Sequence, residues 1–256
     1  MTAFRIAIVA ALALTTGGAM AETLKVGIAA EPYPPFTVPD VSGNWSGFEI
    51  DFANAICAKM GDTCEITPTS WDGIIPALTS KKIDMIVASM SITEDRMKTI
   101  DFSDPYYNTP AVLVGAKDAP DYTGPDQLKG KILGVQTATT HQSYADKHFA
   151  GIADIKVYQT QDEANQDLAS GRIDYVQADI LPMTDYVNTE TGKACCRIVG
   201  QVEADKAILG NGVGVGLRKG DTALKDKVNK AIADIRADGT YKTINDKYFT
   251  FDVFGE

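Results

Sequence analysis

Histidine and the common catalytic motifs are scarce in this sequence. Its 256 residues include only two histidines, His141 and His148. They contain no G-x-S-x-G elbow, no H-E-x-x-H pair, no Walker loop and no G-x-G-x-x-G that opens a helix. In the glycine run 210–216 (GNGVGVG), valine alternates with glycine, which predicts a strand near a hinge rather than a phosphate loop. The sequence therefore predicts no catalytic residue and argues against an enzyme.

Basic residues are too few for a protein that binds phosphate backbones. The 24 Lys and Arg face 34 Asp and Glu, so the net charge is −10. This excess of acid disfavours nucleic acid and anionic bilayers as partners. With 45% hydrophobic and 23% charged residues, the composition is typical of a soluble globular protein. The length suffices for one large domain or two modest ones.

Long apolar runs are also missing, apart from one near the start. Arg5 precedes nine apolar residues at positions 6–14, and an A-x-A cleavage pattern ends at Ala21. A run of this length falls short of the roughly 20 residues that span a bilayer. Residues 1–21 are therefore predicted to be a secretory signal peptide that is cleaved after Ala21.

The four cysteines would then lie in an oxidising compartment. Cys57 and Cys64 flank a predicted helix end at Gly61, which favours a disulfide across this small loop. Cys195 and Cys196 are adjacent, so free thiols, a vicinal bridge and an intermolecular link all remain open. No second cysteine motif accompanies the two histidines, so no metal site is predicted.

Strand-like apolar runs alternate with amphipathic helical patterns, which predicts an α/β protein. A first strand is expected over residues 24–30. A helix should begin at Phe48, because apolar residues recur every four positions through Met60. Another helix should be capped by Asp221 and end before Gly239, with a buried stripe made of Leu224, Val228, Ile232 and Ile235.

An internal similarity with a spacing of 90 residues suggests two related halves. The segment 78–89 (LTSKKIDMIVAS) resembles 168–179 (LASGRIDYVQAD), and each fits a helix end, a tight turn and a buried strand. The two strands finish on polar residues, Ser89 and Asp179. Ligands of open α/β sheets bind beyond the carboxyl ends of strands, so two facing lobes would bring these ends to one cleft. Chance similarity of two ordinary helix–strand units is the alternative.

Three polar segments could together hold a zwitterion. Ser89, Ser91 and Arg96 follow one buried strand, and the guanidinium of Arg96 could clamp a carboxylate in a bidentate pair. The segment 134–140 (GVQTATT) offers hydroxyls and backbone N–H groups to the same carboxylate if a helix begins there. Asp179 would complement an ammonium. Each feature alone also fits a surface ion pair or a capping turn.

Seven motifs in order along the chain resemble the polar amino-acid-binding proteins of ABC importers. They are YPPF (33–36), GFEID (47–51), WDGIIPAL (71–78), SMSITEDR (89–96), IDFSDPY (100–106), VGVGLRK (213–219) and DGTY (238–241) with KYF (247–249). The resemblance covers essentially the whole mature chain. It is closest to the branch of solute-binding protein family 3 that holds the lysine/arginine/ornithine-, histidine- and octopine-binding proteins, including the pair Cys57 and Cys64.

The resemblance implies the two-lobed periplasmic-binding-protein fold of type II, with two hinge strands and a ligand cleft between the lobes. Residues 22–109 and 211–256 would form lobe 1, and residues 110–210 would form lobe 2. The expected function is the capture of a polar amino acid, or of a derivative such as an opine, in the periplasm. A monomer without a cofactor would deliver this ligand to the membrane permease subunits of an ABC importer. A cyclohexadienyl or arogenate dehydratase on the same fold is the alternative, and a sensory module is a further one.

The resemblance also implies roles for single residues. Arg96 should grip the ligand α-carboxylate and Asp179 the α-ammonium, while Tyr33 and Trp71 enclose the ligand side chain. The residues expected to assist are Ser89, Met90, Ser91, Thr139 and Thr140. Two positions depart from the pattern: Ala88 stands where some relatives carry serine, and Ala30 stands where relatives place an acid for a basic ligand. Glu31, displaced by one position, could take the place of that acid.

Overall fold

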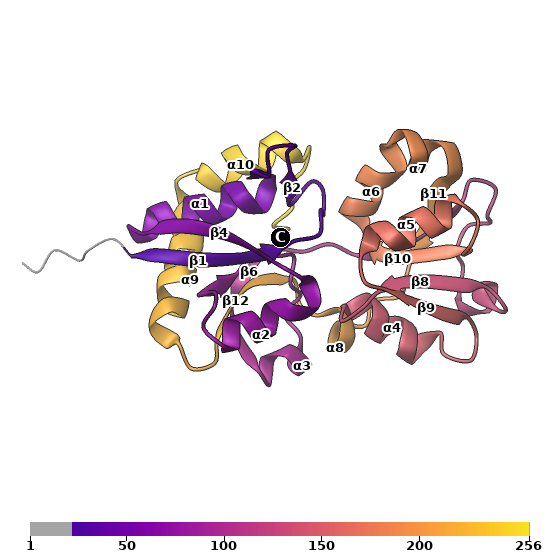
Figure 1. Cartoon of the computed structure of the whole chain (residues 1–256), viewed down its shortest axis with the longest axis horizontal. Helices are drawn as coiled ribbons and strands as arrows, with labels where there is room; N and C mark the ends of the chain where they lie inside the picture. The colour runs from indigo at the N-terminus through magenta and orange to yellow at the C-terminus, as the bar shows by residue number, and fades with distance from the viewer. Residues whose placement is uncertain (1–21, 256) are drawn as a thin grey trace, which may run out of the picture.

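The strands of the protein form two separate five-stranded sheets in the computed structural model, which describes residues 22–255 (Figure 1). The first sheet has the order β4-β1-β5-β12-β6 and contains β1 (Thr23–Ala29), β4 (Thr63–Thr69), β5 (Met85–Ile86), β6 (Ile100–Tyr107) and β12 (Val213–Arg218). The second has the order β11-β7-β10-β8-β9 and contains β7 (Ala111–Ala116), β8 (Ile132–Gln136), β9 (Asp154–Tyr158), β10 (Tyr175–Asp179) and β11 (Cys196–Gln201). We call each sheet with its covering helices a lobe. The chain passes between the lobes after β6 and again after β11.

The two sheets share one plan. If the second is read from its other edge, β9-β8-β10-β7-β11 matches β4-β1-β5-β12-β6, and the two strands of the 90-residue similarity, β5 and β10, are both central. Each of them pairs in parallel with one neighbour and antiparallel with the other. The predicted α/β fold with two lobes is confirmed, and the similarity reflects equivalent places in the two sheets.

Residues that are identical in the two similar segments have equivalent structural roles in the two lobes. The carboxylate of Asp84 accepts from the N–H of Lys25 at 3.0 Å, and that of Asp174 accepts from Ile132 at 2.8 Å. Each aspartate thus fixes the start of its central strand to the neighbouring parallel strand. The preceding turns have left-handed residues at matching positions, Lys81 with φ 63° and Gly171 with φ 71°. Lysine occupies in lobe 1 a conformation that glycine adopts without steric cost in lobe 2.

The helices of lobe 1 include the two that the sequence predicted. α1 (Phe48–Met60) buries Phe48, Phe52 and Ile56, and it ends at Gly61 in the left-handed conformation. α9 (Thr222–Ala237) is capped by the side chain of Asp221 and buries Val228, Ile232 and Ile235, with Leu224 partly buried. The other helices are α2 (Ile74–Thr79), α3 (Glu94–Met97), α10 (Thr240–Tyr248) and the 3-10 turn η1 (Trp71–Gly73). A short hairpin joins β2 (Val38–Pro39) to β3 (Trp45–Ser46).

Lobe 2 holds five helices among the described residues, together with the 3-10 turn η2 (Pro125–Leu128). They are α4 (Thr140–His148), α5 (Gln161–Ala169), α6 (Ile180–Asn188), α7 (Glu190–Cys195) and α8 (Lys206–Leu209). Apolar clusters cover both faces of the second sheet, as they do in the first. Each lobe therefore has its own hydrophobic core on both faces of its sheet.

All four cysteines are paired. A disulfide joins Cys57, near the end of α1, to Cys64 in β4, as predicted. Cys195 and Cys196 form a vicinal bridge, one of the three states that the sequence left open, at the junction of α7 and β11. The hydroxyl of Tyr186 lies 3.6 Å from the sulfur of Cys195.

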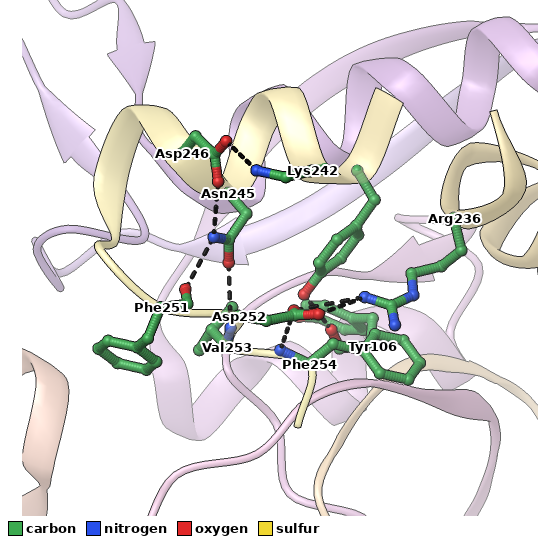
Figure 2. Close-up of polar contacts among 10 residues, drawn as sticks. Tyr106, Arg236, Lys242, Asn245, Asp246, Phe251, Asp252, Val253 and Phe254 are labelled. Carbon is green, nitrogen blue, oxygen red and sulfur yellow. Dashed lines mark hydrogen bonds and ion pairs between the residues drawn. The ribbon is translucent and has the colours of Figure 1, made fainter. Parts of the chain in front are cut away.

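The end of the chain packs back on lobe 1, close to the first passage between the lobes (Figure 2). Asn245 donates to the carbonyl of Phe251 at 2.8 Å and accepts from the N–H of Val253 at 3.0 Å. Arg236 pairs with Asp252 at 3.1 Å and stacks 3.9 Å from the ring of Phe254. The carbonyl of Val253 accepts from the N–H of Asn108, directly after β6. The tail thereby braces the first passage against lobe 1.

The predicted signal peptide, residues 1–21, lies outside the described residues. Among residues 22–255, no helix has the length and apolar character needed to cross a membrane.

Candidate functional site

A cleft lies between the two lobes and is lined by side chains of both. Small-molecule sites commonly occupy such clefts between two units of a fold. The structure brings nine of the ten predicted ligand residues to its wall: Glu31, Tyr33, Trp71, Ser89, Ser91, Arg96, Thr139, Thr140 and Asp179. They come from segments up to 148 positions apart in the printed sequence.

Met90 is the predicted residue that does not line the cleft. Its side chain is 1% exposed and belongs to the apolar cluster that contains Ile74, Leu78 and Ile86. The side chains of Ser89 and Ser91 line the cleft, whereas that of Met90 packs into this core. The prediction for Met90 treated the whole motif as one surface.

Ser89 sits in a tight bend that a buried acid holds in place. Its φ is 52°, in the left-handed region that is uncommon for residues other than glycine. Its N–H donates to the Glu49 carboxylate at 2.6 Å, and Tyr106 donates to the same oxygen. The hydroxyl of Ser89 is buried and has no partner among the described residues, so it is available to a ligand.

Arg96 projects from α3 across the cleft. The hydroxyl of Thr93 caps this short helix by accepting from the N–H of Arg96. The guanidinium donates to the carbonyl of Ser91 at 3.0 Å and to that of Ala138, in the other lobe, at 3.3 Å. It lies 5.3 Å from the centroid of the Trp71 ring. Burial lowers its pKa to about 10, against the opposing charges of Asp179 and Asp95, so Arg96 is a cation at neutral pH.

The start of α4 faces Arg96 from lobe 2. The helix begins at Thr140, where the sequence placed a helix N-terminus, and Thr140 itself is 9% exposed. The hydroxyl of Thr139 caps the helix by accepting from the N–H of Gln142, and it donates to the carbonyl of Gln136 at 2.7 Å. Unpaired N–H groups of a first helical turn attract carboxylates. Thr140 therefore remains free to meet a ligand, while Thr139 is engaged in the cap.

Asp179 ends β10 and precedes α6, with its carboxylate in the cleft. Tyr33 donates to it at 2.8 Å and Thr109, on the first passage between the lobes, at 3.3 Å. Burial alone would raise the pKa of Asp179, but the neighbouring imidazole of His141 and the hydrogen bonds from Tyr33 and Thr109 outweigh this effect and lower it. Asp179 is therefore an anion that can pair with an ammonium.

Glu31 and Trp71 form one unit at the lobe 1 side of the cleft. Both carboxylate oxygens of Glu31 accept from the backbone N–H of Trp71, at 3.3 and 3.2 Å. This contact ties the acid to the start of η1. The carboxylate is held in the cleft wall by the backbone of Trp71, although it lies one position from the acid of the family pattern.

Five polar residues of the cleft wall were not predicted: Thr37, Glu49, Gln136, His141 and Gln161. Burial raises the pKa of Glu49 to about 7, against the hydrogen bonds from Tyr106 and Ser89. Glu49 stood inside a quoted motif, but its face on α1 gave no sign of a polar role. His141 directly follows two predicted residues, Thr139 and Thr140. It was not predicted because the two histidines were considered only for catalysis and metal binding. Gln136 and Gln161 reach the cleft only through the packing of lobe 2.

The cleft thus presents a cation and an anion from opposite lobes, with hydroxyls and an aromatic ring between them. Such an arrangement can satisfy both charges of a zwitterion, whose unpaired burial would cost several kcal/mol. Within residues 22–255, no group of three or more His, Cys, Asp or Glu side chains is placed to hold a metal ion.

Comparisons with known proteins agree with this geometry. Residues 24–251 match the family described as bacterial extracellular solute-binding proteins, family 3. The L-arginine-binding protein of Pseudomonas aeruginosa is 41% identical over 258 residues, 98% of each protein. The lysine/arginine/ornithine-binding periplasmic protein of Escherichia coli is 37% identical over 246 residues, 95% of this chain and 94% of that protein.

A solved structure shares the whole architecture. An ancestral arginine-binding protein bound to arginine is 39% identical and has a TM-score of 0.81, covering 89% of this chain and 98% of its own. These relatives are named as binding proteins, in agreement with the expectation that the chain is not an enzyme. The expected resemblance to amino-acid-binding proteins is confirmed: the chain belongs to the bacterial extracellular solute-binding proteins of family 3.

Proposed function

We propose that this protein binds an L-amino acid with a cationic side chain and delivers it to the permease of an ABC importer. The observation that carries the proposal is the placement of Arg96 and Asp179 on opposite walls of one cleft. Arg96 pairs with the α-carboxylate, helped by the start of α4 and the hydroxyls of Ser89 and Ser91. Asp179 pairs with the α-ammonium.

The preference for a cationic side chain follows from the acidic residue that is left in the cleft once the ligand backbone has paired with Arg96 and Asp179. This residue is Glu31, which remains as an acid in the cleft wall that Trp71 also lines. A guanidinium suits both, since it pairs with carboxylates and stacks on aromatic faces. Relatives named for arginine and for lysine/arginine/ornithine support the same class.

Location and organisation complete the proposal. Residues 1–21 direct export and are removed after Ala21, and the mature protein works as a monomer in the periplasm. Residues 22–109 with 211–256 form lobe 1 and residues 110–210 form lobe 2, which agrees with the passages of the chain after β6 and β11. Tyr33 of lobe 1 and Asp179 of lobe 2 then meet the ligand together as the lobes close.

The test is calorimetric titration with L-arginine and with L-citrulline, its uncharged isostere. We expect arginine to bind at least about tenfold more tightly, since one charge-assisted pair contributes about 1.5–3 kcal/mol. In Glu31→Gln this preference should disappear. Glu65→Gln, at an exposed position of β4, is the matched control and should keep it. Failure of lysine, ornithine, arginine, histidine, octopine and nopaline to bind at all would refute the proposed function.

A further inference from the structure

His141 occupies the boundary between two cavities. It is the second residue of α4, and its side chain is 7% exposed. It lines the ligand cleft and also a smaller adjoining pocket, whose wall includes Asn108 and Gly212 on the two passages of the chain. The imidazole therefore lies between the ligand cleft and the segments that connect the two lobes.

The contacts of His141 leave it with spare hydrogen-bonding capacity. Its Nε2 is 3.5 Å from Oδ2 of Asp179, the same oxygen that accepts from Tyr33. This distance exceeds the 2.7–3.2 Å of a good N–H···O bond. Its Nδ1 is buried and has no partner among the described residues. The ring is thus close to the carboxylate without being bound firmly to it.

We propose that His141 is a recognition residue that competes with the ligand α-ammonium for Asp179, so that protonation of His141 weakens ligand binding. The inference rests on the proposed function, because it needs a ligand whose ammonium pairs with Asp179.

Charge at Asp179 explains the competition. An imidazolium at this place neutralises the carboxylate that the ammonium requires, and it adds a like charge next to the ammonium. A neutral imidazole does neither and can use its free nitrogen as a hydrogen-bond partner for the ligand. Histidine side chains ordinarily change charge between about pH 5 and 8, so two pH values near the ends of this range test the competition.

Other titratable groups face the same space and must be separated from His141. Glu31, Tyr33, Glu49, Arg96 and Asp179 line the cleft with it. Of these, Glu49 has its pKa raised by burial to about 7, and it could also make binding depend on pH. On the same helix, His148 and Lys147 pair with Asp205 at 2.8 and 2.9 Å, away from the cleft. His148, the other histidine of the chain, is therefore the matched control for His141.

The experiment is calorimetric titration of L-arginine at about pH 8 and about pH 5.5. The wild-type protein should bind about tenfold more weakly at the lower pH, which is the loss of affinity for one proton displaced over one pH unit. His141→Gln should show less than about a twofold change, whereas His148→Gln should keep the wild-type dependence. A tenfold change that persists in His141→Gln, or its absence from the wild-type protein, overturns the inference.

Nuclear magnetic resonance of the unmodified protein gives an independent reading. The chain has two histidines, so only two imidazole signals have to be assigned. Saturating L-arginine should move the titration midpoint of the His141 signal to lower pH and leave that of His148 in place. Equal midpoints with and without arginine overturn the inference. If arginine binds at neither pH, the proposed function fails, whereas binding without pH dependence refutes the role of His141 alone.

Discussion

Replacing Arg96 by alanine should weaken ligand binding far more than it weakens the fold. The guanidinium is directed into the cleft, and its hydrogen bonds within the protein are two contacts to the carbonyls of Ser91 and Ala138. With a ligand carboxylate in place, Arg96 becomes one member of a desolvated charge pair. Loss of one partner of such a pair costs about 2–5 kcal/mol, which corresponds to about 30-fold to several thousand-fold in the dissociation constant.

Calorimetric titration of L-arginine measures the effect directly. Arg96→Ala should lose affinity by the factor above, and Arg96→Lys should lie between it and the wild-type protein, because lysine keeps the charge but not the bidentate fork. Arg172→Ala is the matched control, since this arginine forms a surface ion pair with Asp167 on the turn before β10. It should bind as the wild-type protein does.

Stability decides whether a loss of binding is specific. The two carbonyl contacts of Arg96 contribute about 1–3 kcal/mol to the free energy of unfolding, so Arg96→Ala should still fold cooperatively. Urea denaturation monitors this. If the alanine variant binds arginine within about threefold of the wild-type protein, Arg96 does not hold the carboxylate and the reasoning is refuted.

Three further predictions concern stability. Lys81→Gly should raise the free energy of unfolding by about 0.5–1 kcal/mol in urea, because φ at position 81 is 63° and the equivalent position in lobe 2 is Gly171; a decrease would contradict this. Removing the disulfide by the double substitution Cys57→Ser and Cys64→Ser should lower the free energy of unfolding by about 2–3 kcal/mol, as expected for a short loop. An unchanged denaturation midpoint would count against this contribution. Burial raises the pKa of Glu49 from 4.5 to about 7, so the folded protein retains a proton that the unfolded chain releases. The resulting stability is complete below the lower value and is lost as the pH rises through about 7, amounting to about 3 kcal/mol. Glu49→Gln should flatten this slope in denaturation at several pH values, and a slope equal to wild type would reject the assignment.

Local patterns were sufficient for the elements of the fold. The four-residue apolar spacing from Phe48 gave α1, the cap at Asp221 gave α9, and the alternation of valine and glycine from Val213 gave β12. These features depend on neighbours within one or two turns, so the sequence contains them directly. The 90-residue similarity likewise revealed two equivalent central strands.

The site was predicted less completely, because its residues meet only after both lobes have folded. The sequence placed Arg96, Asp179 and Met90 at one site; the first two line the cleft, whereas the side chain of Met90 turns into the core. His141 escaped notice since nothing in its local sequence shows that it faces Asp179. Glu31 stood one position from the expected acid, and its hold on the Trp71 backbone is visible only in three dimensions.

The sequence by itself determined the class of fold and the family, and it indicated Arg96 and Asp179 as charged residues of one cleft. Tertiary structure alone decided which side chains of those motifs face the cleft, that the adjacent cysteines are bridged, and that a histidine lies beside Asp179. The physical reason is that periodicity and capping act over a few residues. The electrostatics of the cleft, in contrast, depends on distances between atoms far apart in the sequence. Nε2 of His141 lies 3.5 Å from Oδ2 of Asp179 because the start of α4 packs beside the end of β10.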